Sequence, residues 1–141
     1  MSTEDVDRLK VHRREVVLDG ERFTVLSPRP QTGVRFSTNL FHEAWHIACD
    51  VDSARFLARV LWAMAYQHGA PTIVVVDEPF LVPNPFDAGP SDPIVVINSE
   101  LASPRVDGFR ALRAQLPVSS IPSAGTVRLQ TRGLDVARGE P

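Results

Sequence analysis

Thr72-Ile-Val-Val-Val76 and Ile94-Val-Val-Ile97 are the two stretches that decide the fold of this chain. Both are short, continuously apolar and β-branched, a composition typical of strands that are covered on both faces of a sheet. We therefore predict two buried strands that are neighbours or near-neighbours. The segment between them, residues 77–93, contains five prolines and is longer than most connections, which indicates a loop.

Toward the amino terminus, the sequence predicts a β-hairpin over residues 15–26. Asp19-Gly20 lies between two apolar runs, and this dipeptide readily adopts the positive φ angles of a type I′ turn. Val34 and Phe36 are candidates for a further short strand. Residues 1–13 are polar and are expected to form a loose lead-in.

Residues 38–51 form the segment that is hardest to assign. On a helical wheel its apolar side chains gather on one side, which favours an amphipathic helix. A strand is the alternative, since Trp45, Ile47 and Cys49 alternate with His46 and Ala48. We predict the helix because it accounts for more residues over a longer window.

Two further helices are predicted after this segment. One covers residues 53–67, and its apolar face points opposite to that of residues 38–51, so the chain must break near residues 50–52. Asp52 is the predicted N-cap at this break. The other helix begins near Ser103 and ends before Pro117.

A last strand at residues 126–130 completes the predicted elements, and the tail at 132–141 is expected to be peripheral. The fold class is α+β or α/β, with a mixed sheet of about five strands, an amino-terminal hairpin and three helices packed on the sheet. The length of 141 residues indicates a single domain over 1–141.

Composition excludes several classes of function. The net charge of −2 leaves no basic excess for nucleic acid, and the longest apolar run is too short to span a membrane. Cys49 is the only cysteine, so no intramolecular disulfide can form. The amino terminus lacks the apolar region of a signal peptide, and we expect a cytoplasmic protein.

One motif suggests chemistry. His42-Glu43-Ala44-Trp45-His46 matches H-E-x-x-H. On a helix, residues four apart share a face, so both imidazoles could bind one metal ion. Glu43 would then be the general base that activates a metal-bound water. Zinc needs a third protein ligand, and Asp52 follows His46 at six residues.

With Asp52 included, this stretch resembles the extended zinc-binding motif of the metzincin endopeptidases, H-E-x-x-H-x-x-G-x-x-H or its Asp-ended variant. The resemblance implies His42, His46 and Asp52 as zinc ligands and Glu43 as the catalytic residue of a small zinc-dependent hydrolase. Cys49 stands where that family has a glycine. The alternative for the motif is the solvated face of an amphipathic helix.

The loop at residues 77–93 is the second candidate site. It places Phe80, Leu81 and Phe86 among stiff prolines, and long loops often carry function. These side chains could form an interface, or they could fold back and cap the sheet. We predict a non-catalytic binding, regulatory or assembly module that uses this loop and no cofactor, and that binds a protein partner or itself. The alternative function is the zinc hydrolase.

Overall fold

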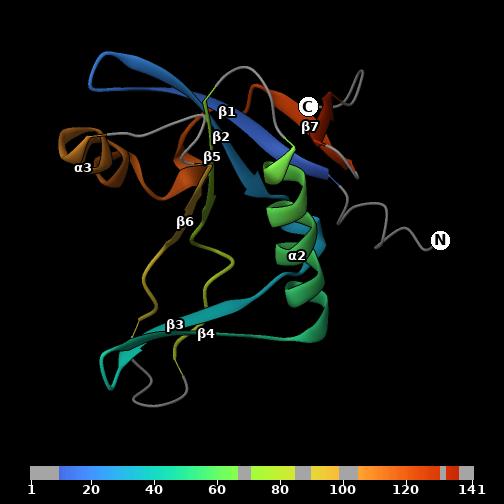
Figure 1. Cartoon of the computed structure of the whole chain (residues 1–141), viewed down its shortest axis with the longest axis vertical. Coiled ribbons are helices and arrows are strands. Elements are labelled where there is room, and N and C mark those ends of the chain that lie inside the picture. Colours follow the sequence, from blue (N-terminus) through green and yellow to red (C-terminus); the bar gives the residue numbers. More distant parts are fainter. Residues whose placement is uncertain (1–9, 67–70, 85–89, 99–104, 131–132, 137–141) are drawn as a thin grey trace.

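The computed structural model describes residues 10–66, 71–84, 90–98, 105–130 and 133–136 (Figure 1). The strands are β1 (Lys10–Leu18), β2 (Glu21–Pro28), β3 (Phe36–Phe41), β4 (Ala44–Cys49), β5 (Thr72–Val76), β6 (Ile94–Ile97), β7 (Gly125–Gln130) and β8 (Gly133–Val136). The α-helices are α2 (Val51–Ala65) and α3 (Val106–Gln115), and the short 3-10 turns are η1 (Pro30–Thr32) and η2 (Val118–Ser120).

The fold is α+β. A mixed sheet of six strands has the order β6-β5-β2-β1-β7-β8, and β3 and β4 form a separate two-stranded sheet. Strands β2 and β5 are parallel, while the other neighbouring pairs in the large sheet are antiparallel. Within the described ranges no helix is long and apolar enough to cross a membrane.

The amino-terminal hairpin is confirmed. Asp19 and Gly20 have φ angles of 51° and 82°, as a type I′ turn requires, and they join β1 to β2. The hairpin is longer than predicted, because β1 begins at Lys10 and pairs with β7, so residues 10–13 do not belong to a loose lead-in. The tail also contributes structure, since β8 pairs with β7.

The two apolar stretches are neighbouring strands, as predicted. All five residues of β5 are buried between β2 and β6. The prediction that both are buried strands is wrong for β6, which forms the edge of the sheet and leaves Val95 38% exposed. A strand with one neighbour has less of its surface covered than a central strand, and sequence composition does not distinguish the two positions.

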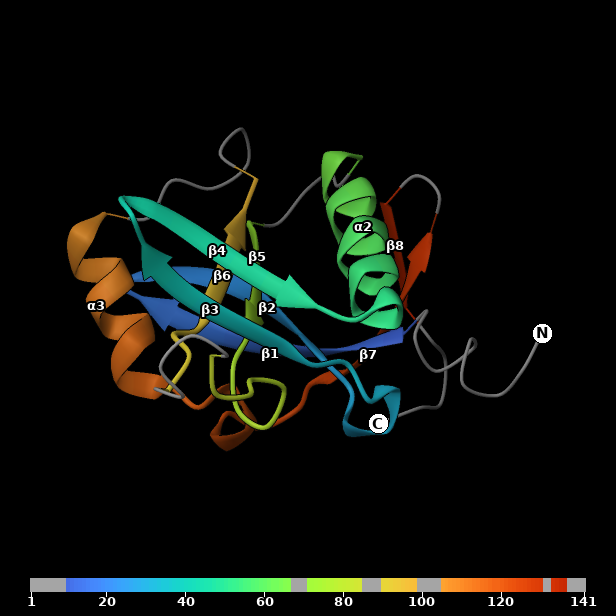
Figure 2. The same cartoon turned by 90° about the horizontal axis from the view of Figure 1, so that it is seen from below.

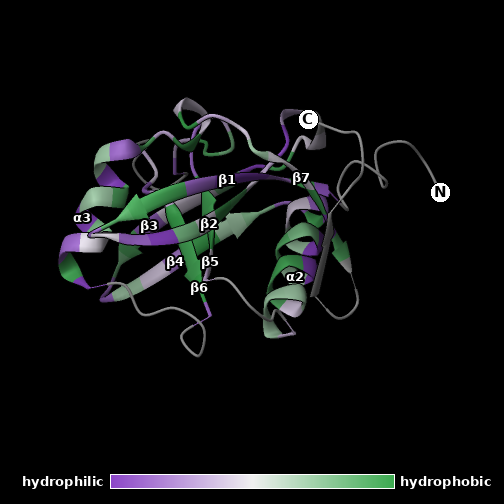
Figure 3. Ribbon diagram, turned by 90° about the horizontal axis from the view of Figure 1, so that it is seen from above, coloured by the Kyte–Doolittle hydropathy of each residue, from purple (hydrophilic) through white to green (hydrophobic). Residues whose placement is uncertain are grey.

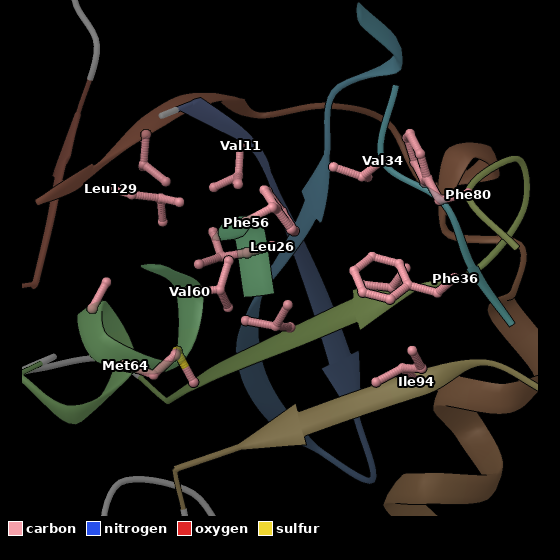
Figure 4. Packing of buried hydrophobic residues seen from close by; sticks show 14 of the residues in the cluster. Val11, Leu26, Val34, Phe36, Phe56, Val60, Met64, Phe80, Ile94 and Leu129 are labelled. Atoms are coloured by element: carbon pink, nitrogen blue, oxygen red, sulfur yellow. The ribbon is translucent and has the colours of Figure 1, made fainter. Parts of the chain in front are cut away.

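Successive residues of a strand point to opposite faces of the sheet, and the two faces carry separate cores. The first core lies under α2, which carries both hydrophobic and hydrophilic residues (Figure 3). Its side chains come from the sheet and from this helix (Figure 4). The sheet contributes Val11, Leu26, Val74, Val76, Val127 and Leu129, and the helix contributes Phe56, Val60 and Met64. The second lies under α3 and η2 and contains Val16, Leu18, Phe23, Val25, Ile73, Val75, Leu112, Val118 and Ile121.

Residues 38–51 do not form the predicted helix. They lie in the β3–β4 hairpin, and its two-residue turn is His42-Glu43, with φ angles of 49° and 62°. The strand alternative is therefore correct. The apolar positions fit both the helical and the strand period. In the hairpin Trp45 pairs with Leu40 and Ile47 pairs with Thr38, and the aromatic Trp45 and the β-branched Ile47 and Thr38 suit a strand.

The predicted break after this segment is confirmed, because the chain passes from β4 to α2 at Asp50. The N-cap is Asp50 and not Asp52: Asp50 Oδ1 accepts a hydrogen bond of 2.7 Å from the backbone N–H of Ser53. Two of the three predicted helices are thus present. The second of them, α3, begins at Val106, and the predicted cap Ser103 lies outside the described residues.

The hairpin and the predicted helix differ in how they respond to a glycine at position 43. In the turn, Glu43 has a positive φ that costs a non-glycine residue about 1 kcal/mol, so Glu43→Gly should leave the free energy of unfolding unchanged or raise it by up to that amount. Equilibrium urea unfolding measures this difference.

The matched control is Ala58→Gly, at an exposed position inside α2. This substitution should lower the free energy of unfolding by about 1 kcal/mol. Equal losses for Glu43→Gly and Ala58→Gly would contradict the hairpin.

Candidate functional site

The residues of the H-E-x-x-H motif lie at the tip of the β3–β4 hairpin. The ring of Phe41 contacts both histidines edge-on, with ring centroids 4.1 Å from His42 and 6.1 Å from His46. His46 Nε2 lies 3.2 Å from the carbonyl oxygen of Phe41. Glu43 is exposed in the turn. The tip therefore brings aromatic and imidazole rings together, but it lacks the helical face on which two histidines four residues apart could bind one metal ion.

The third predicted zinc ligand is remote from the turn. Asp52 is in the first turn of α2, beyond the opposite end of β4. A six-residue strand is about 20 Å long, so roughly that length of hairpin separates Asp52 from the His42-Glu43 turn. Among the described residues no group of three or more His, Cys, Asp or Glu side chains could hold a metal ion. The predicted ligands are thus not brought together.

Cys49 is not paired with a histidine for nucleophilic catalysis. Residues three apart on a strand point to opposite faces, so Cys49 and His46 lie on different sides of β4. Desolvation, and then the nearby carboxylate of Asp50, raise the pKa of the Cys49 thiol. A raised pKa lowers the fraction of thiolate, which is the nucleophilic and metal-binding form.

The loop at residues 77–93 anchors the hairpin to the sheet. The N–H of Phe36 donates to the carbonyl of Phe80 at 2.9 Å, and the N–H of Val82 donates to the carbonyl of Phe36 at 2.8 Å. Leu81 forms a parallel bridge with Phe36. Phe80 and Leu81 are buried in the first core, with 5% and 8% exposure, beside Val34 and Phe36 (Figure 4). They fold back, which was the alternative for this loop.

Burial gives Phe80 and Leu81 no surface to offer a partner, so the interface prediction is not supported at these two positions. Phe86, the third predicted interface residue, lies outside the described residues.

Buried polar side chains fasten the α3–β7 connection to the other face of the sheet. Asp77 Oδ2 accepts from the N–H of Val118 at 2.8 Å, and Arg14 Nε donates to the carbonyl of Ile121 at 2.7 Å. Arg14 also donates to the Ser27 hydroxyl. Burial raises the pKa of Asp77 and lowers the pKa of Arg14. These contacts are structural, because each charged group binds the chain's own backbone.

The feature that sequence reasoning missed is an exposed apolar face on the hairpin. Leu40, Trp45 and Ile47 share one side of the β3–β4 pair, with exposures of 57%, 61% and 49%. Trp45 and Ile47 line a groove of about 400 Å³ together with Thr38, Asp92, Pro93, Ile94 and Arg113. In Figure 2 the hairpin crosses the large sheet from the side of α2 to the side of α3.

A second groove, of about 340 Å³, continues this face. It lies between α3 and β6, where Val95, Val106 and Phe109 are 38%, 66% and 40% exposed. Pro93 and Arg113 line both grooves and join them. We call the whole region the hairpin–α3 surface and define it by Leu40, Trp45, Ile47, Pro93, Val95, Val106 and Phe109. The alternation of Trp45, Ile47 and Cys49 with His46 and Ala48 was the signal in the sequence for the hairpin part of this surface.

Comparison of the chain with models of protein families, with curated proteins and with solved structures found no match.

Metal analysis tests the histidine motif. We expect untagged protein to purify without stoichiometric zinc, and we expect His46→Ala to change the free energy of unfolding by less than about 1 kcal/mol, because His46 is exposed and its contact with the Phe41 carbonyl lies at the surface. Zinc at one ion per chain, lost in His46→Ala, would instead support the hydrolase. In that case Glu43→Gln should keep the metal and abolish hydrolysis, since a general base is not a ligand.

A second substitution tests the role of the loop. Phe80→Ala should lower the free energy of unfolding by about 3–5 kcal/mol, because it leaves a cavity in the first core. Val82→Ala, two residues along and 36% exposed, is the control and should cost less than about 1 kcal/mol. Similar small losses in urea unfolding for both variants would show that Phe80 is not a core residue.

Proposed function

We propose that this chain is a non-catalytic protein-binding module whose interface is the hairpin–α3 surface. The observation that supports this is a gathering of six large exposed apolar side chains. Five of them line two joined grooves, and the sixth, Leu40, pairs with Trp45 across the hairpin; the five are Trp45, Ile47, Val95, Val106 and Phe109. Their exposed fractions amount to on the order of 400 Å² of apolar side chain, taking about 200 Å² for an aromatic and roughly 100 Å² for an aliphatic side chain. The largest apolar patch on a typical monomer has about this area and is often functional.

The kinds of residue on this surface are those that contribute most to protein interfaces. Tryptophan, phenylalanine and arginine are enriched where binding energy concentrates, and here Trp45 and Phe109 lie with Arg113 around the grooves. The exposed apolar side chains are surrounded by polar groups such as Asp92 and Arg110, which gives the usual apolar centre and polar rim.

The carboxyl-terminal end of the loop at residues 77–93 takes part in this interface. Pro93 lines both grooves, and Asp92 lines the one under the hairpin. The Thr38 hydroxyl donates to the Asp92 carbonyl at 2.8 Å, and the Thr38 N–H donates to the Ser91 hydroxyl at 2.9 Å. The loop thus holds the hairpin at Thr38 while Leu40 and Trp45, nearer the turn, stay exposed for a partner.

A non-catalytic role agrees with the separation of the reactive groups. His46 and Cys49 point to opposite sides of β4, and Asp52 lies on another element. The exposed thiol of Cys49 suits a reducing compartment, and we place the module in the cytosol.

Photo-crosslinking in the cells that produce the protein tests this proposal. A benzophenone amino acid in place of Trp45 should give crosslinked protein products. The same group in place of Val17, which is 57% exposed on β1, should give none. Adding Ile47→Glu to the first variant should reduce the yield at least about tenfold, because binding would bury an unpaired charge.

Equal yields from positions 45 and 17, or no product from position 45, would contradict the proposal. Far-UV circular dichroism of each variant shows whether the fold is retained.

A further inference from the structure

We infer that the partner bound by the hairpin–α3 surface is a second copy of this chain, in a two-fold dimer where Trp45 of each copy enters the α3–β6 groove of the other. This inference rests on the proposed function and adds the identity of the partner. A two-fold interface uses the same patch on both subunits, so the patch must be complementary to itself. The shape, charge and size of this surface each meet that condition.

The surface carries both a projecting side chain, Trp45, and beside it a groove that could receive the same side chain of a second copy. Trp45 stands on the exposed side of the hairpin with 61% exposure, and the α3–β6 groove lies next to it across Pro93 and Arg113. That groove, of about 340 Å³, is lined mainly by apolar side chains. Phe109 offers an aromatic ring, and an arginine can stack on the face of an indole.

The charges on the rim are mixed in a way that suits a copy of the same surface. Asp92 and Arg113 line the hairpin groove, and Arg110 lines the α3–β6 groove. A partner carrying one sign of charge would meet both attraction and repulsion there. A second copy, rotated by the two-fold axis, can set acid against base on both sides of the axis.

The exposed area matches what a stable dimer needs. About 400 Å² of apolar side chain on each copy would bury roughly 800 Å² of apolar surface in a pair, before any polar rim is counted. Specific interfaces bury about 1,200–2,000 Å² in total, and about 65% of a homodimer interface is apolar, so this surface supplies the apolar part of an interface at the lower end of that range.

Sedimentation of the full chain over about 1 µM to 1 mM, a range that brackets moderate dissociation constants, tests the inference. The mass should rise with concentration from 15.6 kDa toward twice that value. Trp45→Glu and Val106→Glu should each raise the dissociation constant at least about hundredfold, since each places a charge in a closed apolar contact. Both residues are more than half exposed, so the fold should tolerate the changes.

Trp62→Glu is the matched control. Trp62 is 55% exposed on α2, away from the hairpin–α3 surface, and its substitution should leave the dissociation constant unchanged. The variant Trp62→Phe leaves Trp45 as the only tryptophan. Its fluorescence emission should shift to shorter wavelength over the same concentrations as the rise in mass, because the indole leaves water.

A monomer at every concentration would overturn the inference, as would a dimer that Trp45→Glu and Val106→Glu do not weaken or that Trp62→Glu weakens equally. The crosslinking experiment separates this failure from failure of the proposed function. If the wild-type chain is monomeric and position 45 crosslinks to a different protein, the module binds that protein. If there is neither a dimer nor a crosslink, both ideas are wrong.

Discussion

The backbone pairing of Phe36 with residues 80–82 is the constraint on which the rest of the structure depends. Its two hydrogen bonds join the start of β3 to the loop that leaves β5, and its ring is fully buried in the first core. Among the described residues, the printed hydrogen bonds between the hairpin and this loop lie in the first half of β3, at Phe36 and Thr38. Leu40 and Trp45 lie at the far end from Phe36, and both are exposed.

Most of the sheet could be predicted from local sequence, for identifiable reasons. Asp19-Gly20 readily adopts the positive φ angles of a type I′ turn, so the sequence alone predicts the first hairpin. The continuously apolar, β-branched run of β5 is typical of a strand covered on both faces of a sheet. The hairpin at residues 36–49 carries no such turn signal. His42 and Glu43 adopt positive φ angles that Asn-Gly would favour, so only tertiary pairing reveals the turn. Without a turn signal in the sequence, the apolar pattern of residues 38–51 fits a helix and a strand almost equally well.

The candidate site could be predicted less well, because both predictions depended on secondary structure that the sequence left open. The chemistry of H-E-x-x-H requires a helix, and on a hairpin the same letters place His42 in a turn and His46 on a strand. Phe80 and Leu81 were predicted as interface residues, but they are buried in the first core, because apolar residues in a loop can serve a core as well as an interface. The exposed apolar residues of the candidate site, Trp45 above all, are ones that the predicted helix would have buried against the core.

At the β6 edge of the large sheet, two features disfavour association by strand addition and favour association through side chains. An open edge strand invites pairing with another chain, and short length or a nearby proline reduces that hazard. Here β6 has four residues and follows directly after Pro93, which has no N–H to donate. The same proline lines both grooves of the hairpin–α3 surface. One residue thus limits backbone pairing at the edge and shapes the adjoining apolar contact, so a partner would be selected by the fit of Trp45 and its neighbours.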